Sequence, residues 1–195
     1  MLGEKAFLKK MAPDSRSVLE DCIWEKAKSL RFFSYGSNMN EKKFKRDMKG
    51  KAGLINKTTA TLSGFKRTLS NKSELHGAAF SIRCSPSDEV EGICHDIPIE
   101  LLEDFLKKEG VLKGDASSYR LVKVSILNEN EPILTLCGLK PVSLDKLSLK
   151  KTKRALNYVK ESIQGAECCD AKHSDMKEMK KKLEDLIRTK EKPAK

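Results

Sequence analysis

The amino-acid sequence predicts an α+β domain, in which a strand-rich core is followed by a helical C-terminal segment. Between residues 31 and 139, short runs of aromatic and β-branched residues are separated by Gly, Pro, Ser and Asp, which is typical of strands and turns. A helical pattern interrupts these runs near residue 100, and beyond Pro141 the apolar spacing is helical. A strand-rich core with helices at intervals favours the α+β class.

The chain divides into three predicted segments. Residues 1–29 are a leader, interrupted at Pro13 and Asp14, that is either partly disordered or packed onto the domain. Residues 30–189 form the domain, and residues 190–195 are expected to fray. A chain of 195 residues is long enough for one domain with a real core and short for two.

The domain begins with an aromatic strand over residues 31–35. Residues 36–38 end this strand, and Asn40 is a candidate N-cap for a short helix that ends at Gly50. A strand that gives way to a helix presents free backbone N–H groups, which can bind a carboxylate. From the residues alone, an ordinary strand-to-helix turn is favoured and an anion site is the alternative.

Four short strands and two turns are predicted next. The turn signals are Ser63-Gly64 and the Ser-Pro-Ser-Asp segment at residues 85–88. The strands they separate are residues 60–62, 65–69, 77–82 and 90–97.

A helix is predicted over residues 98–108, because Pro98 suits a first helical position and apolar residues recur after it at helical spacing. Gly110 lies where a glycine commonly caps such a helix. The remaining predicted elements are strands at residues 119–127 and 132–139, a turn at 128–131, and two C-terminal helical stripes, Leu156/Val159/Ile163 and Met176/Met179/Leu183/Leu186.

Glu109 is a candidate acid/base residue at the end of the predicted helix. The helix dipole disfavours an acid at this end, so the carboxylate is out of place there. Val111 and Leu112 could desolvate it and adapt it to proton transfer. The alternative is a surface glutamate paired with Lys107 or Lys108, and the pattern alone favours that alternative.

Three further sites are candidates for chemistry. Tyr119 opens a strand, where its phenol could hydrogen-bond a substrate or only pack. Cys94 and His95 are an improbable catalytic pair, since adjacent strand residues point to opposite faces. Ser37 lacks the Gly-x-Ser-x-Gly context of a serine nucleophile and is a better candidate for a substrate ligand or turn former.

The formal net charge is +11, and residues 140–195 hold 16 Lys/Arg against 9 Asp/Glu. The lysines are interleaved with acids, and no aromatic residue near Lys180–Lys182 could stack on a base. A solvated helix face is therefore the favoured interpretation, and nucleic-acid binding is not expected. A binding module that uses these basic helices is the alternative function.

Cysteine usage and hydropathy indicate a cytoplasmic location. No apolar run approaches the ~20 residues that span a bilayer, and no apolar block follows the N-terminal lysines as in a signal peptide. The six cysteines are expected as reduced thiols. With no Cys-x-x-Cys pair and only scattered histidines, no metal site is predicted.

Three stretches, taken in order, resemble the γ-glutamylcyclotransferase family. The first is the aromatic strand that runs into Tyr-Gly-Ser-Asn at residues 35–38. The second is the turn and strand entry at residues 85–92, and the third is the segment 102–119 with Glu109-Gly110-Val111 and then Tyr119. Their order and approximate spacing agree with the family across residues 31–127.

This resemblance implies a small mixed β-barrel flanked by helices, and Glu109 as the proton-transfer residue. It implies conversion of a γ-glutamyl amino acid, or a related γ-glutamyl amide, into 5-oxoproline and a free amino acid, without a cofactor. A homodimer is plausible on the same grounds. The expected substrate-binding residues are Phe32, Phe33, Ser34, Tyr35, Gly36, Ser37, Asn38 and Tyr119.

The sequence also departs from the family pattern on the side of the leaving group. Glu91 follows Asp-Glu-Val where the family often has an aromatic residue. The linker 144–153 lacks the tyrosine that family members can place there, and Tyr158 comes later. A preference for an acidic leaving group is one use for the many lysines.

Overall fold

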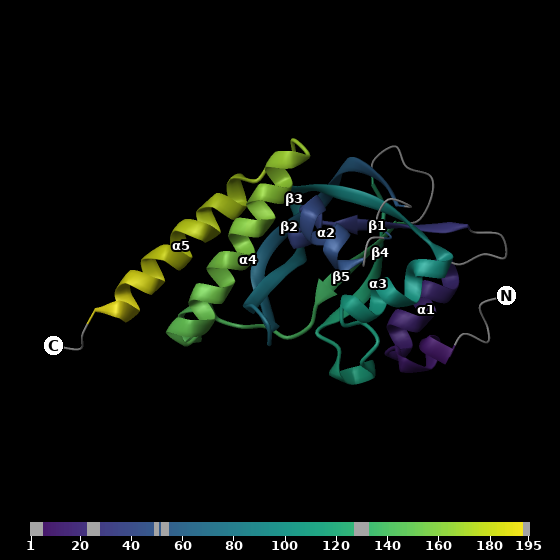
Figure 1. Ribbon diagram of the computed structural model, residues 1–195, viewed down its shortest axis with the longest axis horizontal. Helices are drawn as coiled ribbons and strands as arrows, with labels where there is room; N and C mark the ends of the chain where they lie inside the picture. The colour runs from purple at the N-terminus through teal and green to yellow at the C-terminus, as the bar shows by residue number, and fades with distance from the viewer. Residues whose placement is uncertain (1–5, 23–27, 49–50, 52–54, 127–132, 193–195) are drawn as a thin grey trace.

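The computed structural model describes residues 6–22, 28–48, 51, 55–126 and 133–192, and the statements below concern those residues. It is a single curled sheet with helices on both faces (Figure 1). The predicted end of a helix at Gly50 and the predicted turn at residues 128–131 lie outside the described residues.

Five strands form one mixed sheet in the order β2-β3-β1-β5-β4. Strand β1 pairs in parallel with β5, and the other neighbours are antiparallel. The bounds of the strands are β1 (Ser29–Ser34), β2 (Asn56–Ser73), β3 (Gly77–Pro98), β4 (Tyr119–Val124) and β5 (Ile133–Gly138). The predicted α+β class is confirmed.

The sheet curls without closing into a barrel. The tip of the β2–β3 hairpin folds toward the end of β5, where Asn71 bridges to Pro141 and Gly138 N–H donates to Ser81 Oγ at 2.9 Å. No strand pairing joins the two edge strands, β2 and β4, within the described residues. The expected barrel is therefore an open, strongly curled sheet.

Both turn predictions at residues 63–64 and 85–88 were wrong. Strands β2 and β3 run past these positions as one long hairpin, with Phe65 opposite Cys84 and Ser63 opposite Glu89. Gly64 of β2 and residues 85–88 of β3 are therefore not paired in the ladder, and they form an irregular bulge. Gly64, with φ at +81°, turns the chain locally while pairing continues on either side.

The helices follow the predicted order. The Asn40 side chain caps α2, because its Oδ1 accepts from Lys43 N–H at 3.0 Å. The α-helices are α1 (Pro13–Cys22), α2 (Glu41–Asp47), α3 (Leu102–Lys108), α4 (Leu149–Cys168) and α5 (Ser174–Glu191). Short 3-10 turns are η1 (Ala6–Lys10), η2 (Ser37–Met39), η4 (Ile99–Leu101), η5 (Gly114–Ala116) and η6 (Leu144–Lys146).

Two apolar clusters lie on the two faces of the sheet. Phe33 of β1 belongs to the cluster covered by α4 and α5, whereas Phe32 belongs to the cluster covered by α1 and α3. Successive strand residues point to opposite faces, so β1 contributes to both cores. Figure 1 shows α4 and α5 as an antiparallel pair on one side and α1 and α3 together on the other.

The leader packs onto the domain over the residues described. Phe7, Leu8 and Leu19 are buried in the second cluster. Each such side chain contributes about 1.5–3 kcal/mol when it is fully buried. The hydroxyl of Ser15 also accepts from the N–H of Leu121 in β4 at 3.2 Å, which ties α1 to the edge of the sheet.

Helix α5 is held to the sheet by a buried arginine. Arg67 of β2 has a side chain only 1% exposed, and its Nη1 donates to both carboxylate oxygens of Asp175 at 2.9 Å. Its other terminal nitrogen donates to the carbonyl of Glu91 at 2.5 Å. The pairing fixes the first turn of α5 against the β2–β3 ladder.

Cys94 and His95 face opposite cores, as predicted. Cys94 is buried in the cluster under α4, and the His95 ring stacks on Phe44 of α2 with centroids 4.3 Å apart. Burial, aided by the nearby Lys57 cation, lowers the pKa of His95 to about 4. His95 is therefore a neutral core residue at pH 7.

The burial of neutral His95 predicts that the protein loses stability in mild acid. An unfolded histidine titrates near pKa ~6.5, so between that pH and about 4 the unfolded chain binds a proton that folded His95 does not. The free energy of unfolding therefore keeps its full value above this window and decreases as pH falls, by about 2 kcal/mol between pH 7 and pH 5. Urea unfolding at both pH values should show this loss in the wild type and a smaller one in His95→Phe. Equal losses in the two proteins would contradict the assignment.

No helix within the described ranges is long and apolar enough to cross a membrane. No group of three or more His, Cys, Asp or Glu side chains among the described residues is placed to hold a metal ion.

Candidate active site

The loop that follows β1 lies at the centre of the sheet. Strand β1 has β3 on one side and β5 on the other, so the chain leaves the middle of the sheet at Tyr35 and Gly36. It then forms η2 and enters α2 through the Asn40 cap. The predicted order of strand, tight polar loop and helix is confirmed.

Gly36 is required by the space around it. A Cβ atom there would lie 2.8 Å from the Tyr158 hydroxyl and 3.4 Å from the Phe80 ring. Tyr158 projects from α4, far along the chain. The glycine therefore lets a phenol from the C-terminal helix approach the loop backbone.

All three tyrosines of the chain meet at this loop. Tyr35 donates to the carbonyl of Leu136, and Tyr119 donates to the carbonyl of Phe80 at 3.0 Å. The N–H of Phe80 in turn donates to the Tyr158 hydroxyl at 3.4 Å. The loop after β1, strand β4 and helix α4 are thus tied to β3 and β5 around one space.

Burial keeps these phenols neutral. It raises the pKa of Tyr35 and of Tyr119 well above the usual value, and that of Tyr158 to about 12. Hydrogen bonds to Tyr158 from Phe80 and Ser37 act in the opposite direction but are outweighed. At pH 7 the three side chains can donate hydrogen bonds and cannot serve as bases.

Glu109 faces the loop because of how α3 ends. Gly110 has φ at +71°, its N–H bonds to Lys107 O at 3.1 Å, and Val111 N–H bonds to Leu106 O at 3.0 Å. This is a Schellman motif, in which Val111 also packs in the same cluster as Leu106. The motif fixes the helix end, with Glu109 as the C-cap residue that directly follows α3.

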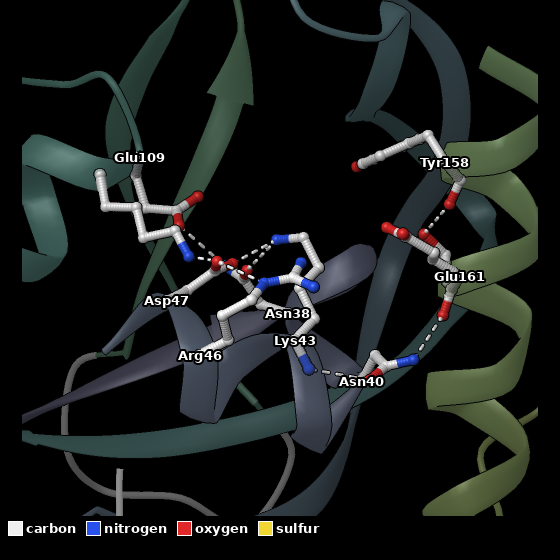
Figure 2. A network of polar contacts seen from close by, with 10 residues as sticks. Asn38, Asn40, Lys43, Arg46, Asp47, Glu109, Tyr158 and Glu161 are labelled. Atoms are coloured by element: carbon white, nitrogen blue, oxygen red, sulfur yellow. Dashed lines mark hydrogen bonds and ion pairs between the residues drawn. The ribbon is translucent and has the colours of Figure 1, made fainter. Parts of the chain in front are cut away.

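Asn38 holds the Glu109 carboxylate. Its Nδ2 donates to Glu109 Oε1 at 3.0 Å, and Lys43 Nζ donates to Asn38 Oδ1 at 3.5 Å. An ammonium group can only donate, so it orients the amide with its NH₂ group toward Glu109. Lys108 forms an ion pair with Asp47, and Glu109 forms no ion pair among the described residues. The alternative of a surface glutamate paired with Lys107 or Lys108 was therefore wrong. Figure 2 shows Glu109 and Asn38 facing Tyr158 across the site.

The residues expected to bind substrate line one small pocket of about 50 Å³ with Glu109. Phe32 and Phe33 are 1% and 0% exposed, so they form its wall and not a ligand surface. Ser34 Oγ is buried there without a hydrogen-bond partner in the described part of the chain. The complete lining is Phe32, Phe33, Ser34, Tyr35, Gly36, Ser37, Asn38, Phe80, Glu109, Tyr119, Leu136 and Tyr158.

The inner pocket opens into an outer cleft of about 450 Å³. Five residues belong to both linings: Ser37, Asn38, Glu109, Tyr119 and Tyr158. Glu109 therefore lies at the junction of a small space and a larger, charged one. Such an arrangement can hold the reacting part of a substrate inside and the departing part outside.

The sequence did not assign Tyr158, Phe80 or Lys43 to the site. Phe80 and Tyr158 reach it from a bulged hairpin and from a helix after the core, so no sequence neighbour marks them. One signal was present, since Tyr158 lies beside Val159 in the apolar stripe of α4. A phenol in a buried stripe needs a polar partner, and here that partner is the backbone of Phe80.

No protein-family model matches the chain, and no curated protein matches it. Several solved structures do match this chain in their fold. One described as γ-glutamyl cyclotransferase has a TM-score of 0.57 at 18% identity, over 83% of this chain and 99% of that one. The yeast γ-glutamyl cyclotransferase specific to glutathione has a TM-score of 0.52 at 14% identity, over 84% and 96%. YkqA from Bacillus subtilis has a TM-score of 0.60 at 21% identity, over 81% of this chain and 55% of that one. The chain has the fold of the γ-glutamyl cyclotransferases.

Proposed function

We propose that the protein is a γ-glutamylcyclotransferase that releases 5-oxoproline from γ-glutamyl amino acids or a related γ-glutamyl amide. The observation that carries the proposal is the placement of Glu109. Its carboxylate is held by Asn38 in a pocket that the loop 35–37 also lines. The shared fold supports the reaction class, and the site supplies the residues.

The reaction needs no nucleophile from the enzyme. The α-amine of the substrate attacks its own γ-carbonyl carbon, so one C–N bond forms and the bond to the leaving nitrogen breaks. The attacking nitrogen loses a proton and the leaving nitrogen gains one, and no water is consumed. Glu109 can carry that proton from one nitrogen to the other, a role typically worth roughly 10²–10⁴-fold in rate.

The pocket contributes by folding the substrate. An extended γ-glutamyl chain must bend until its amine meets its carbonyl, and holding such a pose can contribute ~7–11 kcal/mol at best. The narrow pocket lined by the loop and by Tyr119 and Tyr158 favours the bent form. The backbone N–H groups of Gly36 and Ser37 and the Tyr158 hydroxyl are candidates to hold the carboxylate or the γ-carbonyl oxygen.

A pair of isomeric substrates tests the proposal. Purified protein is incubated with γ-glutamyl-alanine and, separately, with α-glutamyl-alanine, and 5-oxoproline is measured by mass spectrometry. Only the γ-linked isomer should yield 5-oxoproline and alanine. A folded protein that releases none from a panel of γ-linked amino acids and amines would refute the proposal.

Tyr158→Phe should lower kcat/KM by roughly ten-fold and leave the fold intact. The variant loses a hydroxyl that faces Gly36 and Phe80, while the ring keeps its contacts with His76 and Phe80. Steady-state kinetics and thermal unfolding would be compared with the wild type. An unchanged kcat/KM would show that the hydroxyl serves only packing.

A further inference from the structure

Three cations around one carboxylate form a cluster at the outer cleft. Lys43 Nζ lies 2.8 Å from Asp47 Oδ2, Arg46 Nε lies 3.7 Å from Asp47 Oδ1, and Lys108 Nζ contacts Asp47 as well. The side chains of Lys43, Asp47 and Lys108 are only 14%, 15% and 27% exposed. We name these four residues the Asp47 cluster; Figure 2 shows Lys43, Arg46 and Asp47 beside Glu109.

The cluster carries more positive charge than it can neutralise internally. One carboxylate balances one cation, so two positive charges remain; the ammonium groups of Lys43 and Lys108 are partly desolvated, whereas Arg46 is exposed. Burial, together with repulsion from Arg46, lowers the pKa of Lys43 and of Lys108. An anion bound in the cleft would relieve this repulsion.

The cluster lies on the exit side of the proposed chemistry. All four of its residues line the outer cleft and none lines the inner pocket. Lys43 touches Asn38, which in turn holds Glu109, so the cluster is one side chain away from the proton-transfer residue. A substrate whose γ-glutamyl group fills the inner pocket would place its leaving amine beside the cluster.

The rest of the cleft adds no net charge, since its other described lining holds three lysines and three glutamates, Glu109 included. The whole described lining therefore holds six cationic side chains and four acidic ones. Among them, Lys72 and Lys113 at the rim form no ion pair within the described residues. The cleft therefore has an excess of two positive charges, which matches a ligand group with two carboxylates.

We propose that the Asp47 cluster is an anion subsite that selects γ-glutamyl substrates whose leaving amine carries two carboxylates, such as an acidic amino acid. The inference rests on the proposed function and specifies its substrate class. The ends of α2 and α3 also favour cations through their dipoles. That effect explains one basic residue at each helix end but not three cations on one carboxylate.

Three substrates that differ in charge test the inference in the wild type. Their leaving amines are glutamate with two carboxylates, alanine with one, and alaninamide with none. We expect kcat/KM to fall in that order, by about ten-fold at each step, and the differences to shrink as salt is raised. Equal kcat/KM values in an active enzyme would overturn the subsite and leave the proposed function standing. No turnover of any of the three by folded protein would count against the function itself.

Two variants and two matched controls locate the effect. Arg46→Met and Lys108→Met should reduce the preference for γ-glutamyl-glutamate over γ-glutamyl-alaninamide by about ten-fold. Lys42→Met and Lys107→Met remove the same charge from the same helices, outside the cleft, and should leave that preference unchanged. Equal effects of all four would show that only the overall charge matters, which would overturn the subsite.

Discussion

Replacing Glu109 with glutamine is expected to lower the rate of 5-oxoproline formation by roughly 10²–10⁴-fold. The amide fills the same space and can still bond to Asn38, but it cannot accept a proton from the attacking amine or give one to the leaving amine. Because the proton transfer belongs to the transition state, kcat should fall and KM should change little. Stopped assays with wild type and variant measure both constants.

A second glutamate on the same helix serves as control. Glu103 is exposed on α3 and lines neither space, so Glu103→Gln should keep wild-type kinetics. Thermal unfolding of the Glu109 variant should match that of the wild type, since the carboxylate is half-buried and forms no ion pair among the described residues. Full turnover by Glu109→Gln would remove Glu109 from the mechanism.

Gly165→Ala is expected to damage both stability and activity, although alanine normally favours a helix. Gly165 lies in α4 against the site loop, and a Cβ there would meet the Asn40 backbone and lie 2.6 Å from the carbonyl carbon of Met39. Backbone cannot rotate away as a side chain can, so the loop and the helix must separate.

The net effect of Gly165→Ala on stability depends on two opposing free-energy contributions. Replacing glycine by alanine inside a helix gains about 1 kcal/mol, whereas overpacking a tight contact costs about 1–3 kcal/mol and occasionally more. We expect a net loss of stability. A shift of about 1 Å in the loop that carries Asn38 can lower kcat/KM by ~10²-fold.

Gln164→Ala is the matched control, because Gln164 is the exposed neighbour on the same helix. It should change stability by less than about 0.5 kcal/mol and leave kinetics unaltered. Stability would be measured by urea unfolding and activity by 5-oxoproline release. A stabilised and fully active Gly165→Ala protein would show that α4 does not position the loop.

Most elements of this fold could be predicted because each has a local cause. The Asn40 cap, the helix end at Gly110 and the alternation of Phe32 and Phe33 are set by near neighbours in the sequence. The bulge opposite residues 85–88 could not be predicted in this way. Ser-Pro-Ser-Asp has turn chemistry, and only the pairing of β2 with β3 on both sides of it keeps the strand continuous.

The residues of the site also divide into those that near neighbours in the sequence indicate and those that depend on distant contacts. Glu109 and the loop 35–38 are adjacent to helix ends and were identified from the sequence with the help of a family resemblance. Tyr158 was noted only as a late tyrosine, and the Asp47 cluster was not foreseen. Both depend on contacts between distant segments, as in the approach of α4 to Gly36 and the meeting of Asp47 with Lys108.

The basic C-terminal helices keep an alternative function open to test. Some of their lysines are paired with acids, as in Lys153–Glu191 at 2.6 Å and Lys180–Glu184 at 4.0 Å. Binding to nucleic acid through phosphate contacts would weaken steeply as salt rises. We expect γ-glutamyl dipeptides, and not DNA, to compete for a labelled ligand of the cleft.

The central claim is that the substrate's own amine, and not water, attacks the γ-carbonyl carbon. The most direct measurement is turnover of γ-glutamyl-glutamate in heavy-oxygen water, followed by mass spectrometry of the acyl product. The account predicts 5-oxoproline without any heavy oxygen. Glutamate carrying one heavy oxygen in its γ-carboxylate would mean hydrolysis and would contradict it.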